Sequence, residues 1–283
     1  MGITGTKRKG LFLFLILTVG VMFCSSCSGD EDSATMPDWS ANEITIATES
    51  ELIKFAALVN GGKNFFSQTV TLRQNINISA EKWIPIGDLS SNSFRGTFDG
   101  GGFLISGVGE SPIDGFSGLF GYLLGGVIKN LGVEVKMNFD NSATLAAGLV
   151  TVNVGEILNC YVFGSITISS PQENFVGGAI VAINDGRIKN TYSKADISES
   201  NSVGRFVGEN LRKIESSYAL KGNSQGKFVA YDFGEICENP ALKSAEELKT
   251  QSTFINWNFV NIWKISSEEN GGFPLLLTAN SGK

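Results

Sequence analysis

The sequence predicts an all-β protein built as a right-handed parallel β-helix (a β-solenoid) with an N-terminal capping helix and a small C-terminal cap. Three observations lead to this prediction. Four stretches of similar sequence follow one another at intervals near 30 residues, both ends of the repeating region carry short helix-like patterns, and the chain contains 34 glycines but only 6 prolines. Abundant glycine without a proline bias is typical of many tight turns in a regular β architecture.

The repeats begin near Gly118, Gly148, Ala179 and Arg205, so their starts are separated by 30, 31 and 26 residues. When the repeats are aligned, equal positions carry chemically similar side chains. The columns are Leu119, Leu149, Ile180 and Phe206; Ile128, Ile157, Ile188 and Ile214; Gly121, Thr151, Ala182 and Gly208; Asn153, Asn184 and Asn210; and Tyr161, Tyr192 and Tyr218. Self-similarity at such a period is the signature of a solenoid.

Two short strand-like runs per repeat do not form a stable unit alone, but stacked repeats would pair their strands and bury a continuous apolar column. Each coil would lie roughly 4.8 Å above the last, the spacing of hydrogen-bonded strands. Equal residues would then stack, and a column of asparagine amides could satisfy polar groups at a corner of the coil. An antiparallel sandwich is the alternative fold, although its hairpins would not need so long a period.

The ends of a β-helix need covers because open strand edges promote aggregation. Thr48 and Glu51 form a capping-box pattern, and the apolar residues that follow fall on one helix face. The pattern predicts a helix over about 49–60 that covers the N-terminal end of the core and stops at Gly61-Gly62. A second short helical pattern opens at Ser244, and the aromatic residues Trp257, Phe259 and Trp263 are expected to close the C-terminal end.

The region over 1–27 is predicted to be a lipoprotein signal peptide that ends at Cys27. Lys7, Arg8 and Lys9 precede an apolar run over 11–23, which suits a signal-peptide core and is too short to span a bilayer comfortably. Ser25 and Ser26 then precede Cys27, a sequence that resembles the lipobox of bacterial lipoproteins. The resemblance implies cleavage before Cys27 and lipidation of that cysteine. Cleavage before Cys24 and an uncleaved signal anchor are the alternatives.

The segment after Cys27 is polar, with an acidic cluster over 30–32. Such a cluster resembles the surface-export signal of some outer-membrane lipoproteins, and the alternative is a solvated linker. The predicted organisation is therefore a signal peptide over 1–27, a flexible acidic tether over 28–42 and a β-helix domain over 43–283. The predicted location is the outer membrane, with the domain displayed on the bacterial surface and the lipid as the membrane contact.

Composition excludes several kinds of function. Without residues 1–27 the charge balance is 19 − 28 = −9, and no basic run remains, which disfavours a nucleic-acid partner. Histidine is absent, so Ser-His-Asp and Cys-His catalytic arrangements cannot form, and the commonest zinc ligand is missing. We expect no cofactor and no metal. Cys160 occupies an apolar position and is expected to be a buried thiol, while its pairing with Cys237 stays open.

Several segments together resemble the GLUG-motif family of bacterial surface and secreted proteins. They are Trp83–Gly87, Phe94–Gly107, Gly118-Leu119-Phe120-Gly121, Asn159-Cys160-Tyr161, Trp257, Trp263–Ile265 and Gly272–Leu275, and the resemblance covers about 44–277. Departures from the motif are Thr151, Arg205 and Arg212 in place of glycine. The resemblance implies a β-helical surface or secreted protein, often linked to adhesion, and it supplies no catalytic residues.

Few residues suggest catalysis or ligand binding. Gly100-Gly101-Gly102 after Asp99 could indicate a phosphate loop, but the following Lys-Ser/Thr is missing, and a tight turn is the better interpretation. Four carboxylates could cleave a polysaccharide or bind calcium, and three tryptophans could stack on sugar rings, although packing in the core or at an end suits the tryptophans better. These candidates are Asp99, Asp114, Asp140 and Asp185, and Trp83, Trp257 and Trp263.

The predicted function is that of a non-enzymatic cell-surface lipoprotein, an adhesion or binding scaffold that contacts host, matrix or glycan. The alternative is a polysaccharide-binding accessory lipoprotein or a degenerate β-helix hydrolase or lyase. Three acidic residues converging in a groove with an exposed aromatic would favour carbohydrate chemistry. Flat, uncharged faces would favour adhesion or spacing.

Overall fold

A computed structural model of the chain describes residues 36–79, 83–109, 115–139, 144–168, 173–198, 201–222, 226–237 and 241–278. The predicted signal peptide, Cys24, Cys27 and the acidic cluster therefore lie outside the described residues. One compact unit spans Met36–Lys283. It begins before the predicted domain start, because the Trp39 ring stacks on Phe55 at 6.4 Å and Gln68 donates a hydrogen bond to the Trp39 carbonyl. Only residues 28–35 of the predicted tether precede this unit.

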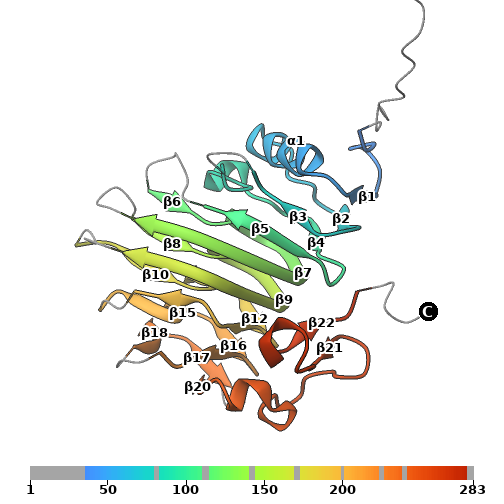
Figure 1. Ribbon diagram of the computed structural model, residues 1–283. Helices are drawn as coiled ribbons and strands as arrows, with labels where there is room; N and C mark the ends of the chain where they lie inside the picture. The colour runs from blue at the N-terminus through green and yellow to red at the C-terminus, as the bar shows by residue number, and fades with distance from the viewer. Residues whose placement is uncertain are drawn as a thin grey trace, which may run out of the picture. The chain divides into compact units, whose positions relative to one another are not determined.

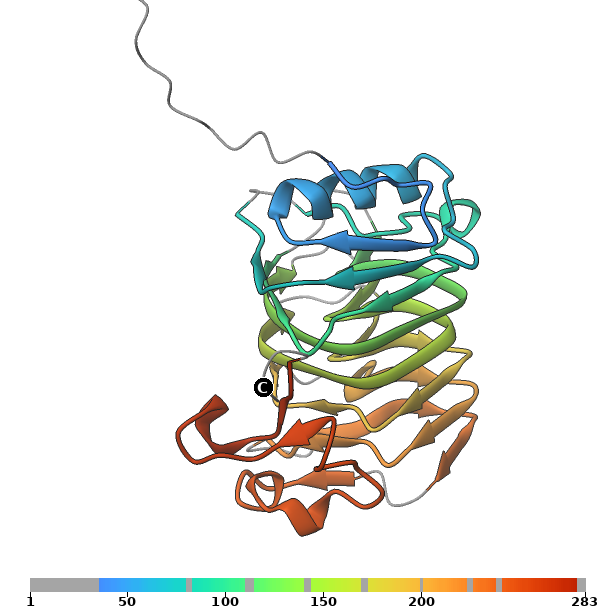
Figure 2. The same ribbon diagram turned by 90° about the vertical axis from the view of Figure 1, so that its right-hand side faces the viewer.

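The unit is a right-handed parallel β-helix, as predicted (Figures 1 and 2). Its strands stack on three sides, and every pairing within the stack is parallel, so the antiparallel sandwich is wrong. The first side contains β1 (Glu43–Ile46), β2 (Thr69–Leu72), β4 (Thr97–Asp99), β12 (Arg187–Lys189), β16 (Lys213–Glu215), β19 (Glu235–Cys237), and parts of β7 (Phe120–Phe139) and β9 (Val150–Ile168). These two long strands continue around a corner onto the second side.

The other two sides are built in the same way. The second contains β3 (Ile76–Asn77), β5 (Leu104–Val108), β13 (Tyr192–Ser193), β14 (Asp196–Ile197), β17 (Tyr218–Leu220) and β20 (Ala241–Lys243). The third contains β6 (Phe116–Ser117), β8 (Leu145–Ala147), β10 (Val176–Gly178), β11 (Val181–Asn184), β15 (Val203–Asn210) and β18 (Lys227–Asp232), together with the first part of β7 and of β9. Because the register is maintained from coil to coil, equal residues of successive coils lie above one another.

The interior confirms the predicted columns. Ile128, Ile157, Ile188 and Ile214 are aligned across four coils and have no exposed surface. Burial of one such side chain stabilises the folded state by roughly 1.5–3 kcal/mol. The core therefore grows by one aligned row of apolar residues with each added coil.

The predicted asparagine column forms a buried hydrogen-bonded ladder. Asn153 Nδ2 donates to Asn184 Oδ1 at 2.7 Å, and Asn184 Nδ2 donates to Asn210 Oδ1 at 2.8 Å. Asp232 extends the ladder by accepting from Asn210 Nδ2 at 2.9 Å. All three asparagines are fully buried, so each amide depends on its neighbours in the adjacent coils for hydrogen bonds.

A second asparagine ladder at another corner was not predicted. Asn130, Asn159 and Asn190 have φ angles of 52°, 52° and 50°, in the left-handed region that Asn tolerates better than most residues. Asn159 Nδ2 donates to Asn130 Oδ1 at 3.2 Å, and Asn130 Nδ2 donates to Asp99 Oδ1 at 3.1 Å. The sequence signal is an Asn that follows the isoleucine of the column by two residues in three repeats.

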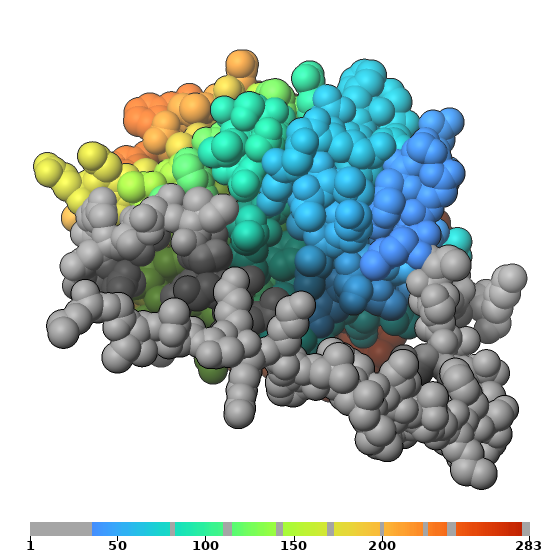
Figure 3. All heavy atoms as spheres, turned by 90° about the horizontal axis from the view of Figure 1, so that it is seen from above, coloured from blue at the N-terminus to red at the C-terminus, as the bar shows by residue number. Residues whose placement is uncertain are grey.

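The N-terminal end is covered as predicted by helix α1 (Glu49–Asn60) (Figures 2 and 3). Thr48 accepts from the Glu51 amide at 3.2 Å, and Glu51 accepts from the Thr48 amide at 3.0 Å, which completes the capping box. The buried face comprises Leu52, Phe55, Ala56 and Val59. The Phe55 ring lies 5.8 Å from that of Phe98 in the first rows of the core.

The C-terminal segment is a small cap, but its aromatic residues cover a flank of the β-helix instead of closing its end. Trp263 lies 6.0 Å from Tyr192, and Trp257 lies 6.1 Å from Tyr218. The tyrosine column points outward from the second side, so it presents an apolar stripe that requires cover. The expectation that Trp257, Phe259 and Trp263 close the end was therefore wrong.

This segment is held by short elements. The helical pattern at Ser244 becomes the 3-10 turn η2 (Glu247–Lys249), followed by η3 (Gln251–Thr253). Farther on, β21 (Trp263–Lys264) and β22 (Leu275–Leu276) pair antiparallel, with η4 (Asn270–Gly272) between them. Another 3-10 turn, η1 (Ser90–Asn92), lies near the N-terminal end. Within the described residues, no helix is both long and apolar enough to cross a membrane.

Ile157→Asp tests the inward assignment of the isoleucine column. The variant places an unpaired charge in a fully buried position, at a cost comparable to the whole stability of a domain, about 5–15 kcal/mol. We expect loss of the β-sheet circular dichroism signal. The control is Leu158→Asp, one residue along on the outer surface and flanked by Lys129 and Lys189. If Ile157→Asp folded as stably as the control, the assignment would be wrong.

Candidate binding surface

The outward residues of the third side form a largely apolar surface, which we call the apolar sheet face. Side chains alternate along a strand, so neighbours of the buried residues point outward, and the register aligns them across coils. The members are Phe116, Tyr122, Leu124, Leu145, Val152, Val154, Val176, Ile183, Leu211, Tyr231 and Phe233. All are half-buried or exposed, and Phe233 is 72% exposed.

This face crosses five coils, so it extends for roughly 20 Å along the stack. The rings of Phe116 and Tyr122 lie 5.5 Å apart. They connect the part of the face on β6, β8 and β10 with the part that starts on β7 and β9. Two acidic residues, Asp185 and Glu209, interrupt the pattern, and Asp185 is neutralised by Arg212 Nε at 2.7 Å. A largely apolar outward face on a folded domain typically marks an interaction site.

The outward surface of the first side is instead charged and neutralises itself. Arg187 lies between Glu156 and Glu215, at 3.7 Å and 2.5 Å, and Lys213 contacts Glu215 at 3.4 Å. The hydrogen bond from Arg187 lowers the pKa of Glu215, whose side chain is only 8% exposed. These pairs join three coils, so their main effect is to stabilise the stacking of the coils.

The four candidate carboxylates do not form a cluster among the described residues. Asp99 accepts hydrogen bonds from the Gly101 amide and from Asn130, and it pairs with Lys129 at 3.2 Å. Asp185 lies at a different corner, beside Arg212. Asp114 and Asp140 lie outside the described residues. No group of three or more metal-ligating Cys, Asp or Glu side chains occurs in the described part of the chain.

The other predicted candidates are structural. Gly101 and Gly102 have φ angles of 59° and 84°, as expected for the tight turn after Asp99. Trp83, Trp257 and Trp263 are 3%, 8% and 0% exposed, so none offers a platform to a sugar ring. The indole N–H of Trp83 donates to the Leu119 carbonyl, and that of Trp257 donates to the Ser216 carbonyl.

Cys160 is a free, buried thiol, as expected. Burial raises the pKa of its thiol to about 12, and Sγ contacts the Leu158 carbonyl at 3.3 Å. The thiol is therefore protonated near neutral pH and unreactive as a nucleophile.

A polar groove of about 420 Å³ runs between the second asparagine ladder and the C-terminal segment. Asp99, Lys129, Asn130 and Asn159 line one wall, and Ile262, Leu276 and Leu277 contribute to the other. A second groove, of about 570 Å³, contains the acids Asp196 and Glu246. Neither groove brings three described acids together with an exposed aromatic, the arrangement that would favour carbohydrate chemistry.

Comparison with known proteins identifies no family for this chain. No protein-family model matches the chain, and no curated protein matches it. A crystal structure described as a putative immunoglobulin A1 protease from Bacteroides ovatus aligns with 83% of this chain and 92% of its own, at 16% identity and a TM-score of 0.49. The predicted membership of the GLUG-motif family stays a prediction.

Glu215→Gln tests the electrostatic coupling between coils. The folded-state pKa of Glu215 lies below its unfolded value, about 4.3, so its stabilising effect is complete above that pH and is lost as pH falls through the folded pKa. We expect the variant to lose about 1–3 kcal/mol at pH 7 and to show a flatter stability profile below pH ~5 in urea titrations. Glu156→Gln, at a carboxylate that is 44% exposed, should cost less than about 1 kcal/mol. Equal losses would contradict the assignment.

Proposed function

We propose that the protein is a non-enzymatic binding scaffold displayed on the bacterial surface, which contacts a host or matrix protein or glycan through the apolar sheet face. The observation that carries this proposal is the alignment of outward apolar residues across five coils. Stacked coils hold those side chains at a fixed spacing, so a ligand meets a surface that is already ordered. Pre-ordering reduces the entropy lost on binding.

The proposed membrane contact is the lipid on Cys27. The small residues Ser25 and Ser26 before it and the basic and apolar leader support this assignment. Residues 28–35 would then connect the lipid to the compact unit that starts at Met36. Fully extended, these eight residues span at most about 29 Å, so the β-helix would stand close to the membrane.

A second candidate function is polysaccharide binding in the polar groove. Its wall combines amides and an ion pair with apolar side chains, which are groups that can bind sugar hydroxyls and ring faces. The described residues place no exposed aromatic in this groove. Adhesion through the apolar sheet face is therefore the proposal that we favour.

Arrays of matrix proteins and glycans, probed with purified residues 28–283, test both candidates. We expect a ligand whose affinity falls by at least roughly tenfold in a Val152→Lys/Ile183→Glu variant, because the two charges replace adjacent apolar contacts. The matched control, Ser165→Lys/Asp196→Glu, places a similar pair on the second side and should bind normally.

The outcomes separate the proposals. Binding that survives the face variant but is lost in Asp99→Ala/Asn159→Ala would move the function to the polar groove. Absence of any ligand on the arrays would contradict a binding role. Mass measurement of the mature N-terminus tests the anchor separately, because an unmodified Cys27 would contradict lipidation without affecting the array result.

A further inference from the structure

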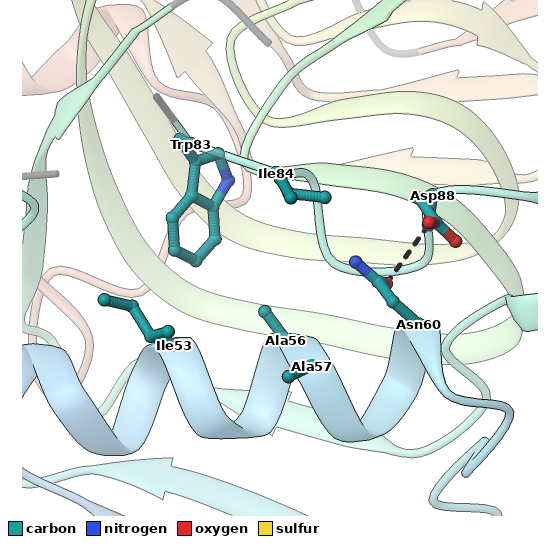
Figure 4. Close-up of a pocket in the computed structure, with 7 residues that line it drawn as sticks. All are labelled: Ile53, Ala56, Ala57, Asn60, Trp83, Ile84 and Asp88. Carbon is teal, nitrogen blue, oxygen red and sulfur yellow. Dashed lines mark hydrogen bonds between the residues drawn. The ribbon is translucent and has the colours of Figure 1, made fainter. Parts of the chain in front are cut away.

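A separate pocket lies between helix α1 and the segment that crosses above it (Figure 4). Its volume is about 280 Å³. One wall is a stripe of α1 in which two alanines leave room between larger residues, and the other wall comes from the segment over 83–88. The lining residues are Ile53, Ala56, Ala57, Asn60, Trp83, Ile84 and Asp88. None of them belongs to the apolar sheet face or to the polar groove.

Hydrogen bonds fix both walls of this pocket. Asn60 Oδ1 accepts from the Gly87 amide at 2.7 Å and from the Asp88 amide at 3.2 Å, and its Nδ2 donates to the Pro85 carbonyl at 3.0 Å. The position of the Trp83 ring is fixed by a hydrogen bond, because its indole N–H donates to the Leu119 carbonyl at 3.1 Å. The helix and the crossing segment are thus joined at one end, and the pocket between them is pre-formed.

The pocket is polar at one end only. Ile53 and Ile84 are each 43% exposed and border its apolar part with Trp83, whereas Asn60 and Asp88 lie together at the other end (Figure 4). The side-chain amide of Asn60 is already hydrogen-bonded to Pro85, Gly87 and Asp88. Asp88 accepts a hydrogen bond from Asn92 Nδ2 at 3.3 Å, and no described Lys or Arg forms an ion pair with it. Its negative charge is therefore available to a ligand.

We propose that this pocket binds a small amphiphile, with its hydrocarbon part between Ile53, Ile84 and the two alanines and a cationic head group at Asp88. Small-molecule sites usually start near 300 Å³ and combine an apolar lining with a few polar groups, so this cavity suits one ring or a short alkyl chain. An anionic head group would meet the like charge of Asp88. The proposal is independent of the lipid anchor and of the apolar sheet face.

Titration calorimetry with octylamine, octanol and octanoate tests the proposal on residues 28–283, which contain the compact unit from Met36 onward. At neutral pH, octylamine should bind at least roughly tenfold more tightly than octanoate, because the first is attracted to Asp88 and the second repelled. In Asp88→Asn this difference should shrink to about threefold or less. The shared alkyl chain keeps the apolar contribution constant across the probes.

A second test of the proposal fills the pocket with a side chain. Ala57 is exposed at the rim, so Ala57→Phe can occupy the cavity without disturbing the core, and it should weaken octylamine binding at least roughly tenfold. Lys54→Phe adds the same ring on an exposed position of α1 outside the pocket and should bind like wild type. Three results would overturn the proposal: no octylamine binding below about 1 mM, unchanged binding in Ala57→Phe, or tightest binding of octanoate.

Discussion

Hydrogen bonding between stacked coils is the interaction on which the rest of this structure depends. Each short parallel strand obtains its main-chain partners from the coils above and below, since a single coil cannot satisfy its own groups. That pairing fixes the register, and the fixed register aligns equal side chains. The isoleucine column, the two asparagine ladders and the tyrosine column are four results of the same constraint.

The same alignment organises the outer surface. Where the outward positions are charged, as around Arg187, the aligned side chains form ion pairs between coils. Where they are apolar, alignment joins individually unremarkable residues into one extended face. The tyrosine column also forms an apolar face, and Trp257 and Trp263 of the C-terminal segment cover it. The apolar sheet face has no comparable cover among the described residues, and this contrast is why we assign binding to it.

Much of the fold followed from the sequence because repetition reports register directly. Ile157, Asn184 and Tyr192 belonged to columns that the aligned repeats made visible. The capping-box pattern of Thr48 and Glu51 predicted the N-terminal helix. The second asparagine ladder was missed although its asparagines recur in three repeats, because their alignment at a corner depends on a left-handed backbone at Asn159, which the repeat pattern alone does not reveal. The position of the C-terminal segment, the outward apolar face and the pocket at α1 were also missed. Each depends on contacts between segments distant in the chain, or on which neighbour of a buried residue points outward.

An engineered disulfide tests the stacking of coils most directly. Ser165 and Asp196 are register partners on adjacent parallel strands, so cysteines there should lie roughly 5 Å apart at Cα, within bridging distance. In a Cys237→Ser background of residues 28–283, the Ser165→Cys/Asp196→Cys variant should oxidise to an intramolecular disulfide, detected by mass. Thr167→Cys/Asp196→Cys, offset by two residues and roughly 8 Å apart, should remain reduced. Oxidation of the offset pair, or of neither pair, would contradict the register on which the columns, ladders and faces depend.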